Sequence, residues 1–251
     1  MEYMGIGLKS ARRVAAPAFT LIEMLVVVAI IAILASLLMP ALRTALAMGR
    51  LTKCLSQQHQ LGIGIRMYSE DYSGWYPLGG ACGCWRVQIL PYVAPALPAW
   101  NGRWGNIPPS YQEWVDYSHA DWPKVTAVDS IFTCPSVPEQ IKQSSIWSSG
   151  NGYNIMNMGY IPNDPYGRRY KRVDQVTSPG DTIVIGDTWD DITLGLWTTI
   201  HLYEPGQAMG LESVGDRHMN GINVAYCDGH AKWHDRYYLL ANPQLYKITK
   251  P

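Results

Sequence analysis

One carboxylate stands out in this chain because of the residues that follow it. Glu23 precedes Met24–Leu42, nineteen residues that contain no charged side chain and only Ser36 and Pro40 outside the apolar types. A charge inside a bilayer costs about 2.5–3.5 kcal/mol on insertion scales, whereas each leucine, isoleucine or valine contributes about 0.3–0.6 kcal/mol in favour of insertion. The segment is therefore expected to cross a membrane as a helix, and Glu23 is expected to have a functional partner there.

The cysteines are a second group with chemical potential, at positions 54, 82, 84, 134 and 227. Cys82 and Cys84 are too close in sequence to pair comfortably with each other. Two pairings remain open: Cys82–Cys134 with Cys84–Cys227, or Cys82–Cys227 with Cys84–Cys134. Cys54 has no partner in either. Free buried thiols are one alternative, and a metal site of Cys82, Cys84, Cys134 and one histidine is another, although its spacing matches no common zinc pattern.

Histidines and aspartates gather near the carboxyl terminus. His218, His230 and His234 surround a predicted turn at Asp228 and Gly229. A metal site of these histidines is one interpretation. The one we favour is a structural hydrogen bond between His218 and the backbone of the turn.

Asp187, Asp190 and Asp191 follow a predicted strand, and oxygen ligands at the end of a strand suit calcium. The match is one of composition without a spaced motif, so a solvated acidic loop is the alternative. Our primary expectation is that the chain holds no metal and no cofactor.

Composition and absent motifs narrow the function classes. The chain contains ten tryptophans but two phenylalanines. Tryptophan suits hydrated contacts with other subunits or with carbohydrate, although ordinary packing within the head is the interpretation we favour. The motifs Gly-x-Ser-x-Gly, Gly-x-x-x-x-Gly-Lys and His-Glu-x-x-His are absent, so we expect no enzyme and no catalytic residue. With 20 basic and 20 acidic residues, nucleic acid is not an expected partner.

A long helix must position Glu23. Leucines recur at helix-like intervals and proline is avoided from Ala41 to about Tyr72, which extends the predicted helix from Thr20 to Tyr72. Ser73 and Gly74 are expected to end it, and Pro40 is expected to kink or loosen it.

The remaining chain is expected to be loop-rich with a few short elements. Residues 85–92 and 110–117 are such elements within 74–170. Two apolar runs, 182–186 and 222–227, predict strands, and the Asp228-Gly229 pair after the second indicates a hairpin with a type I′ turn, which needs positive φ at both positions.

The amino-terminal arrangement resembles the leader of type IV prepilins and type II secretion pseudopilins. Basic residues and a small-residue junction ending at Ala18 precede the apolar segment. The resemblance implies cleavage between Ala18 and Phe19 by a prepilin peptidase, N-methylation of Phe19, and a role for Glu23 as the fifth mature residue. Pro40 falls where pilin helices often carry a proline, and Ala18 stands where the family usually has glycine.

Cleavage at this position would give Glu23 a partner. The new Phe19 amine is a cation and Glu23 an anion, and on neighbouring helices the two neutralise each other within the bilayer. Glu23 would then set the register of each subunit against the next. An uncleaved signal anchor is the alternative.

A second resemblance covers both ends of the chain. The segment from Lys53 to Gly62 is similar to the post-membrane segment of a pseudopilin-like group abundant in planctomycetes. That group usually ends in a His-x9-Asp-Gly element, which this chain carries at His218, Asp228 and Gly229.

Together the resemblances imply an α+β, pilin-like fold, with a long amino-terminal helix packed on a small antiparallel sheet with extended loops. Residues 1–18 would be the leader, 19–73 the transmembrane and assembly helix, and 74–251 a head that includes the 218–234 hairpin. The expected function is a structural subunit of a type II secretion pseudopilus or a type IV pilus-like filament. The alternative is a membrane-anchored module whose tryptophan-rich head binds glycans.

The implied partners are a prepilin peptidase, other copies of the chain, other pseudopilins and an inner-membrane assembly platform. The implied location is the bacterial inner membrane, crossed once, with the head in the periplasm and later in the filament. Basic residues are balanced on the two sides of the apolar segment, so this orientation follows from the leader resemblance.

Overall fold

The computed structural model describes residues 20–77, 79, 84–94, 131–138, 150–154, 158, 171–188 and 214–248. The predicted leader, Phe19, Cys82, the predicted helix 110–117, Asp190 and Asp191 lie outside these residues. The chain divides into two compact units, Met1–Ala45 and Leu46–Pro251.

The long helix forms as predicted. Helix α1 runs from Leu21 to Asp71 and continues on both sides of Pro40. It ends where Ser73 and Gly74 take positive φ values, and the Gly74 amide donates to the Ser69 carbonyl at 2.7 Å. This is a left-handed helix terminus of the kind glycine favours.

A small antiparallel sheet forms the centre of the second unit. Its strands pair in sequence order: β1 (Asn151–Tyr153), β2 (Ile183–Asp187), β3 (Gly221–Tyr226) and β4 (Ala231–Asp235). Every neighbouring pair is antiparallel, and a register shift separates Ile183 and Ile185 where β2 meets β3. The two strands predicted from apolar runs are β2 and β3.

Short helices complete the second unit. Helix α2 spans Cys84–Val93 and corresponds to the short element predicted over 85–92. Helix α6 (Arg236–Ala241) follows β4 directly, and the described residues also contain the 3-10 turns η3 (Val173–Gln175), η4 (Pro179–Asp181) and η7 (Pro243–Tyr246).

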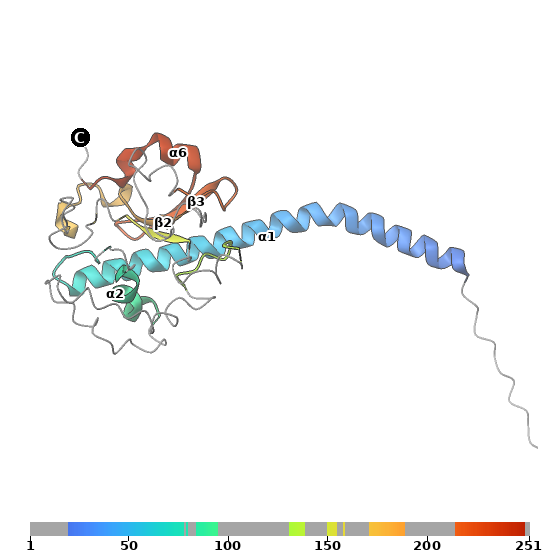
Figure 1. The fold of residues 1–251 in the computed structure, drawn as a ribbon, viewed down its shortest axis with the longest axis horizontal. Coiled ribbons are helices and arrows are strands. Elements are labelled where there is room, and N and C mark those ends of the chain that lie inside the picture. The colour runs from blue at the N-terminus through green and yellow to red at the C-terminus, as the bar shows by residue number, and fades with distance from the viewer. Residues whose placement is uncertain are drawn as a thin grey trace, which may run out of the picture. The chain divides into compact units, whose positions relative to one another are not determined.

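The two faces of the sheet pack against different helices. On one face, Ala225 of β3 and Ile185 of β2 share a core with Leu61 and Ile65 of α1. On the other face, alternate residues of β3, such as Ile222, pack against α6 and η7, as the two-residue period of a strand requires. Figure 1 shows α2 on one side of the second half of α1, and β2, β3 and α6 on the other.

Gly62 allows the close approach of α1 to the sheet. A Cβ built on Gly62 would lie 3.0 Å from the Cβ of Ala225 and 3.4 Å from the carbonyl oxygen of Gly229. Any larger side chain here would separate the helix from β3. The fold class is therefore α+β, with a long amino-terminal helix and a small antiparallel sheet, as predicted.

The predicted turn type of the hairpin is wrong. Strands β3 and β4 pair as expected, but only Gly229 has positive φ (95°), while Asp228 does not. The Gly229 amide donates to the Tyr226 carbonyl, and the Tyr226 amide donates to the His230 carbonyl, both at 2.9 Å. This pattern belongs to the hairpin loop in which a left-handed glycine follows a type I turn, because the loop is one residue longer than a type I′ hairpin allows.

Candidate functional site

The first half of α1 presents a continuous apolar surface. Large side chains from Leu21 to Met48 are exposed, among them Leu21 at 80% and Leu37 at 71% of their full accessible surface. By length and composition α1 is suited to cross a membrane. An apolar surface this extensive is stable only when lipid or other protein covers it.

Glu23 lies in the first turn of α1 and closes a capping box with Thr20. The Thr20 amide and hydroxyl both donate to Oε2 of Glu23, at 2.8 and 2.7 Å, and the Glu23 amide donates to the Thr20 hydroxyl oxygen at 3.3 Å. A Thr-x-x-Glu pair of this kind satisfies two helix-end amides reciprocally. Oε1 of Glu23 accepts no hydrogen bond from the described residues.

The other predicted processing and assembly residues flank Glu23. Ala18 and Phe19 lie outside the described residues. Pro40 lies within α1, where it has no amide to donate to the Ser36 carbonyl. Its own carbonyl accepts a hydrogen bond from the Thr44 hydroxyl at 3.1 Å.

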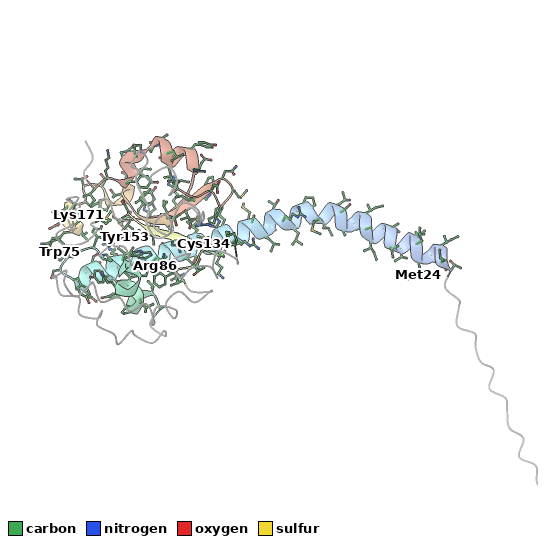
Figure 2. All side chains as sticks on the ribbon, in the orientation of Figure 1. Met24, Trp75, Arg86, Cys134, Tyr153 and Lys171 are labelled. Carbon is green, nitrogen blue, oxygen red and sulfur yellow. The ribbon has the colours of Figure 1, made fainter. Side chains whose placement is uncertain are left out.

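A buried polar cluster lies where α1 meets the sheet. It consists of Cys54, Cys134, Asp187 and His218, whose ligand atoms all lie within 4.8 Å of one another. The Cys54 thiol donates to Oδ1 of Asp187 at 3.0 Å, and Nε2 of His218 lies 3.2 Å from Sγ of Cys134 and 3.3 Å from Oδ2 of Asp187. Cys134 is labelled in Figure 2, against the ribbon of α1.

Burial and mutual contact shift the pKa values within this cluster. Burial, then the neighbouring Cys134, raises the pKa of Asp187. Burial also raises the pKa of Cys54. For Cys134, burial is outweighed by the contact with Cys54 and the charges of Arg217 and His218, so its pKa is lowered. Burial would lower the pKa of His218, but its contacts with Cys134 and Asp187 raise it.

The structure corrects the predicted disulfides. Cys134 and Cys227 are free thiols, as is Cys54, because Cys134 faces the buried cluster while Cys227 packs beside Tyr76 in the core between α1 and the sheet. The side chain of Cys84 lies outside the described part of the chain, as Cys82 does. Cys54, which was left without a partner, is the cysteine that lies beside Cys134.

A helical stripe in the sequence could have identified Cys54. Cys54, Gln58, Leu61, Ile65 and Tyr68 recur at alternating intervals of four and three residues, and all five are buried. The predicted helix was based on the leucines of this region instead, of which Leu61 alone lies on the buried face. The stripe marks the face of α1 that packs on the head.

His218 has a different partner from the predicted one. Its ring contacts Cys134 and Asp187 rather than the backbone at Asp228 and Gly229. Its own backbone forms a tight turn, in which His218 and Gly221 exchange amide-to-carbonyl bonds at 3.1 and 3.2 Å. His218 is therefore structurally separate from the hairpin turn, and the three histidines do not form one site.

The other two histidines lie beside Tyr226. The His230 ring stacks on the Tyr226 ring with centroids 4.2 Å apart, and Nδ1 of His230 lies 2.7 Å from Oδ1 of Asp228. Nε2 of His234 lies 2.6 Å from the Tyr226 hydroxyl. Asp228 and Gly229 thus form the turn itself, with His230 as the partner of the carboxylate.

The tryptophans of the described residues serve packing and polar contacts. Trp85 is fully buried against Phe132 and Tyr153, and the Trp233 indole donates to the His218 carbonyl at 2.8 Å. Trp75 lies under the Arg172 guanidinium. Trp75 and Tyr153, the ring that stacks on Trp85, are both labelled in Figure 2.

Comparison with known proteins identifies the amino-terminal segment. A family model described as the prokaryotic N-terminal methylation motif matches residues 17–39. No curated protein and no solved structure matches the chain. The matched residues include the capping box and most of the exposed apolar surface of α1, and they are followed by a small antiparallel head. The chain therefore carries a prepilin-type amino-terminal methylation motif, and this motif, with the long helix and the small antiparallel sheet, supports a type IV pilin-like protein.

Proposed function

We propose that this chain is a structural subunit of a pilus-like filament, either a type II secretion pseudopilus or a type IV pilus-like fibre. Its work is assembly rather than catalysis. The observation that carries the proposal is the coincidence of the methylation motif at residues 17–39 with the exposed apolar half of α1.

The apolar surface supports both a membrane state and a filament state. Leu21, Leu37 and their neighbours need a covering, and lipid tails are about as apolar as the side chains of sister helices. Exchanging lipid for sister helices is therefore nearly neutral in free energy. An assembly platform can then move subunits out of the inner membrane without a large opposing gradient.

Glu23 supplies the specificity that apolar packing lacks. The capping box with Thr20 holds its carboxylate at the start of the helix and leaves Oε1 open among the described residues. After cleavage before Phe19, the amine of an adjacent subunit is the cation that pairs with Oε1. The pair forms in only one register because each buried charge is costly without the other.

Two substitutions separate the charge of Glu23 from its capping role. Glu23→Gln keeps a side chain that closes a capping box but removes the charge, whereas Glu23→Ala removes both. We expect both variants to enter the membrane normally and to lose filaments, measured by shearing and electron microscopy. Glu70→Gln is the matched control, because Glu70 is an exposed carboxylate on the same helix and pairs with Arg66 at 3.3 Å.

Filaments at normal yield from Glu23→Gln would contradict the charge-pairing role. Maturation is tested separately, by amino-terminal mass spectrometry on protein from its native membrane. We expect a chain that begins at methylated Phe19. A chain intact from Met1 would contradict processing by a prepilin peptidase.

The proposal extends to location and partners. The head lies in the periplasm, and the partners are a prepilin peptidase, further copies of this chain, other pseudopilins and an inner-membrane platform. The His218-x9-Asp228-Gly229 element supports the pseudopilin-like group abundant in planctomycetes, because that group usually ends in such an element.

A further inference from the structure

We propose that Cys54, Cys134, Asp187 and His218 bind one divalent transition metal ion, zinc above all, as a structural site that fastens the second half of α1 to the head. The four side chains come from four separate segments: α1, the 131–138 segment, β2 and the turn before β3. The inference does not depend on the filament function.

The four ligand atoms converge on one point. Each residue offers one atom, and all of them lie within 4.8 Å of one another. A tetrahedral zinc site with metal–ligand bonds of about 2.0–2.3 Å places its ligand atoms roughly 3.3–3.8 Å apart. Sγ of Cys134 and Nε2 of His218 are 3.2 Å apart, and the Asp187 carboxylate lies 3.0 Å from Sγ of Cys54 through Oδ1 and 3.3 Å from Nε2 of His218 through Oδ2, distances close to that requirement.

The same contacts do not fit a catalytic triad. In a Cys-His-Asp triad the nucleophile and the carboxylate bind opposite nitrogens of the imidazole. Here Cys134 and Asp187 both face Nε2 of His218, while Nδ1 has no hydrogen-bond partner among the described residues. All four residues are buried, with exposures between 0 and 2%, so a substrate has no access to the thiols.

The donor set selects the metal. Two thiolates, one imidazole and one carboxylate suit zinc, which takes sulfur, nitrogen and oxygen ligands in a closed tetrahedral site. Calcium and magnesium prefer oxygen ligands only, so the sulfur atoms beside Asp187 argue against the calcium alternative for this residue. Binding displaces the two thiol protons to solvent, because the thiolate is the ligand.

Surrounding residues hold the ligands in place. Asp187 accepts hydrogen bonds from Nε2 of Gln58 at 3.1 Å and from the Asn223 amide at 2.8 Å. Gln58 is fixed in turn by Oδ1 of Asn151 at 2.8 Å. Such outer partners commonly orient metal ligands and tune the site.

A cation lies beside the site. The Arg217 guanidinium donates to the Thr188 and Gly150 carbonyls, and Arg217 and Thr188 are the chain neighbours of His218 and Asp187. Two thiolates and a carboxylate exceed the charge of a divalent ion by one, and Arg217 offsets that excess. The surroundings are therefore balanced for an occupied site.

A Cys54–Cys134 disulfide is the competing state, since the two thiols are neighbours and disulfides persist outside the cytoplasm. The two states are separable by experiment. The untagged full chain, purified in detergent without chelator, is analysed for metal by inductively coupled plasma mass spectrometry. We expect about one zinc per chain, and loss of that zinc in Cys54→Ser, Cys134→Ser and His218→Gln.

Cys227→Ser is the matched control, because Cys227 is a buried thiol in the core outside the cluster, and it should keep the full zinc content. Zinc that persists in all three cluster variants, or a wild-type chain free of zinc with Cys54 and Cys134 joined in unreduced peptide maps, would overturn the proposal.

A second measurement on the wild-type chain guards against variants that fail to fold. X-ray absorption at the zinc edge should show two sulfur ligands at about 2.3 Å and two nitrogen or oxygen ligands at about 2.0–2.2 Å. Removing the metal with a chelator should lower the thermal midpoint, and adding zinc back should restore it. A zinc shell without sulfur, or with more than two sulfur atoms, would assign the metal to other residues.

Discussion

The Tyr226 hydroxyl and Nε2 of His234 lie 2.6 Å apart across the β3–β4 hairpin. His234 is 8% exposed and stacks on the Tyr238 ring with centroids 5.0 Å apart. Burial, followed by the charges of Lys232 and His230, lowers the pKa of His234 to about 4. The hairpin is therefore built around a neutral imidazole.

Acid should weaken the head through His234. Between pH about 6.5 and about 4 the unfolded chain takes up a proton at this position and the folded chain does not, so the free energy of unfolding falls by up to about 3 kcal/mol. The stabilising contribution is complete above pH 6.5 and is lost toward pH 4. We expect denaturant unfolding of His234→Gln to show a shallower decline over that range.

Comparing the wild-type chain with His234→Gln isolates the contribution of His234, because the buried cluster, whose pKa values are also shifted, is the same in both proteins. Parallel stability curves for the wild-type and His234→Gln chains between pH 7 and 4 would show that this imidazole is protonated in the folded state.

Asn154 joins the sheet to the carboxy-terminal turn. Its side-chain amide donates to the Ile183 carbonyl at 2.8 Å and to the Tyr246 carbonyl at 2.9 Å, and the residue is fully buried. Asn154→Asp replaces both donors with a buried carboxylate that faces two carbonyl oxygens. We expect a loss of about 3 kcal/mol or more in the free energy of unfolding, measured by denaturant titration.

Asn242→Asp is the control for the same chemical change at a partly exposed site, where the Asn242 side-chain amide donates to the Tyr238 carbonyl at 2.7 Å. It should change stability by about 0.5 kcal/mol or less. Equal losses at the two positions would mean that the two carbonyl contacts of Asn154 contribute little.

Gly221 begins β3 where no side chain fits. A Cβ there would lie 2.3 Å from the His234 carbonyl oxygen and 2.6 Å from the Trp233 indole. Gly221→Ala should therefore cost about 1–3 kcal/mol. Gly49→Ala in α1, whose Cβ would meet nothing within 4 Å, should be neutral or slightly stabilising because alanine is the better helix former. Thermal unfolding of both variants tests the contrast, which an equal shift would refute.

Asp235 caps helix α6. Its Oδ1 accepts from the amides of Tyr237 at 2.8 Å and Tyr238 at 3.3 Å. Asp235→Ala should cost about 1 kcal/mol, and Asp235→Ser, which keeps a capping oxygen, should recover most of that loss. Indistinguishable unfolding midpoints for the two variants would argue that the cap adds nothing to a helix already held by Leu239 in the core.

Local patterns predicted the long helix and the strands β2 and β3. The long helix was predicted from three features: the uncharged run after Glu23, the avoidance of proline from Ala41 to Tyr72, and the Ser73-Gly74 pair. The structure has this helix over Leu21–Asp71. Two apolar runs were sufficient for β2 and β3. These predictions depend on side-chain periodicity and backbone preferences, which a chain carries within a few residues of each position.

The hairpin shows where local patterns reach their limit. The Asp228-Gly229 pair correctly indicated a reversal, but the choice between a type I′ turn and a type I turn followed by glycine depended on the strand register. Register is decided by which residues of β3 and β4 face the core, and the Tyr226–His230 pairing leaves room for one additional loop residue.

What the sequence determined by itself was the amino-terminal chemistry: an isolated acid at the start of a long apolar helix, within a segment that matches a methylation motif. Only the tertiary structure decided which buried polar residues lie in contact with one another. Cys54, Cys134, Asp187 and His218 follow one another in the chain at intervals of 80, 53 and 31 positions, and no spacing rule relates them. They meet because the buried stripe of α1 packs across the strand that carries Asp187 and the turn that carries His218, and such long-range contacts follow from packing of the whole head rather than from any local pattern.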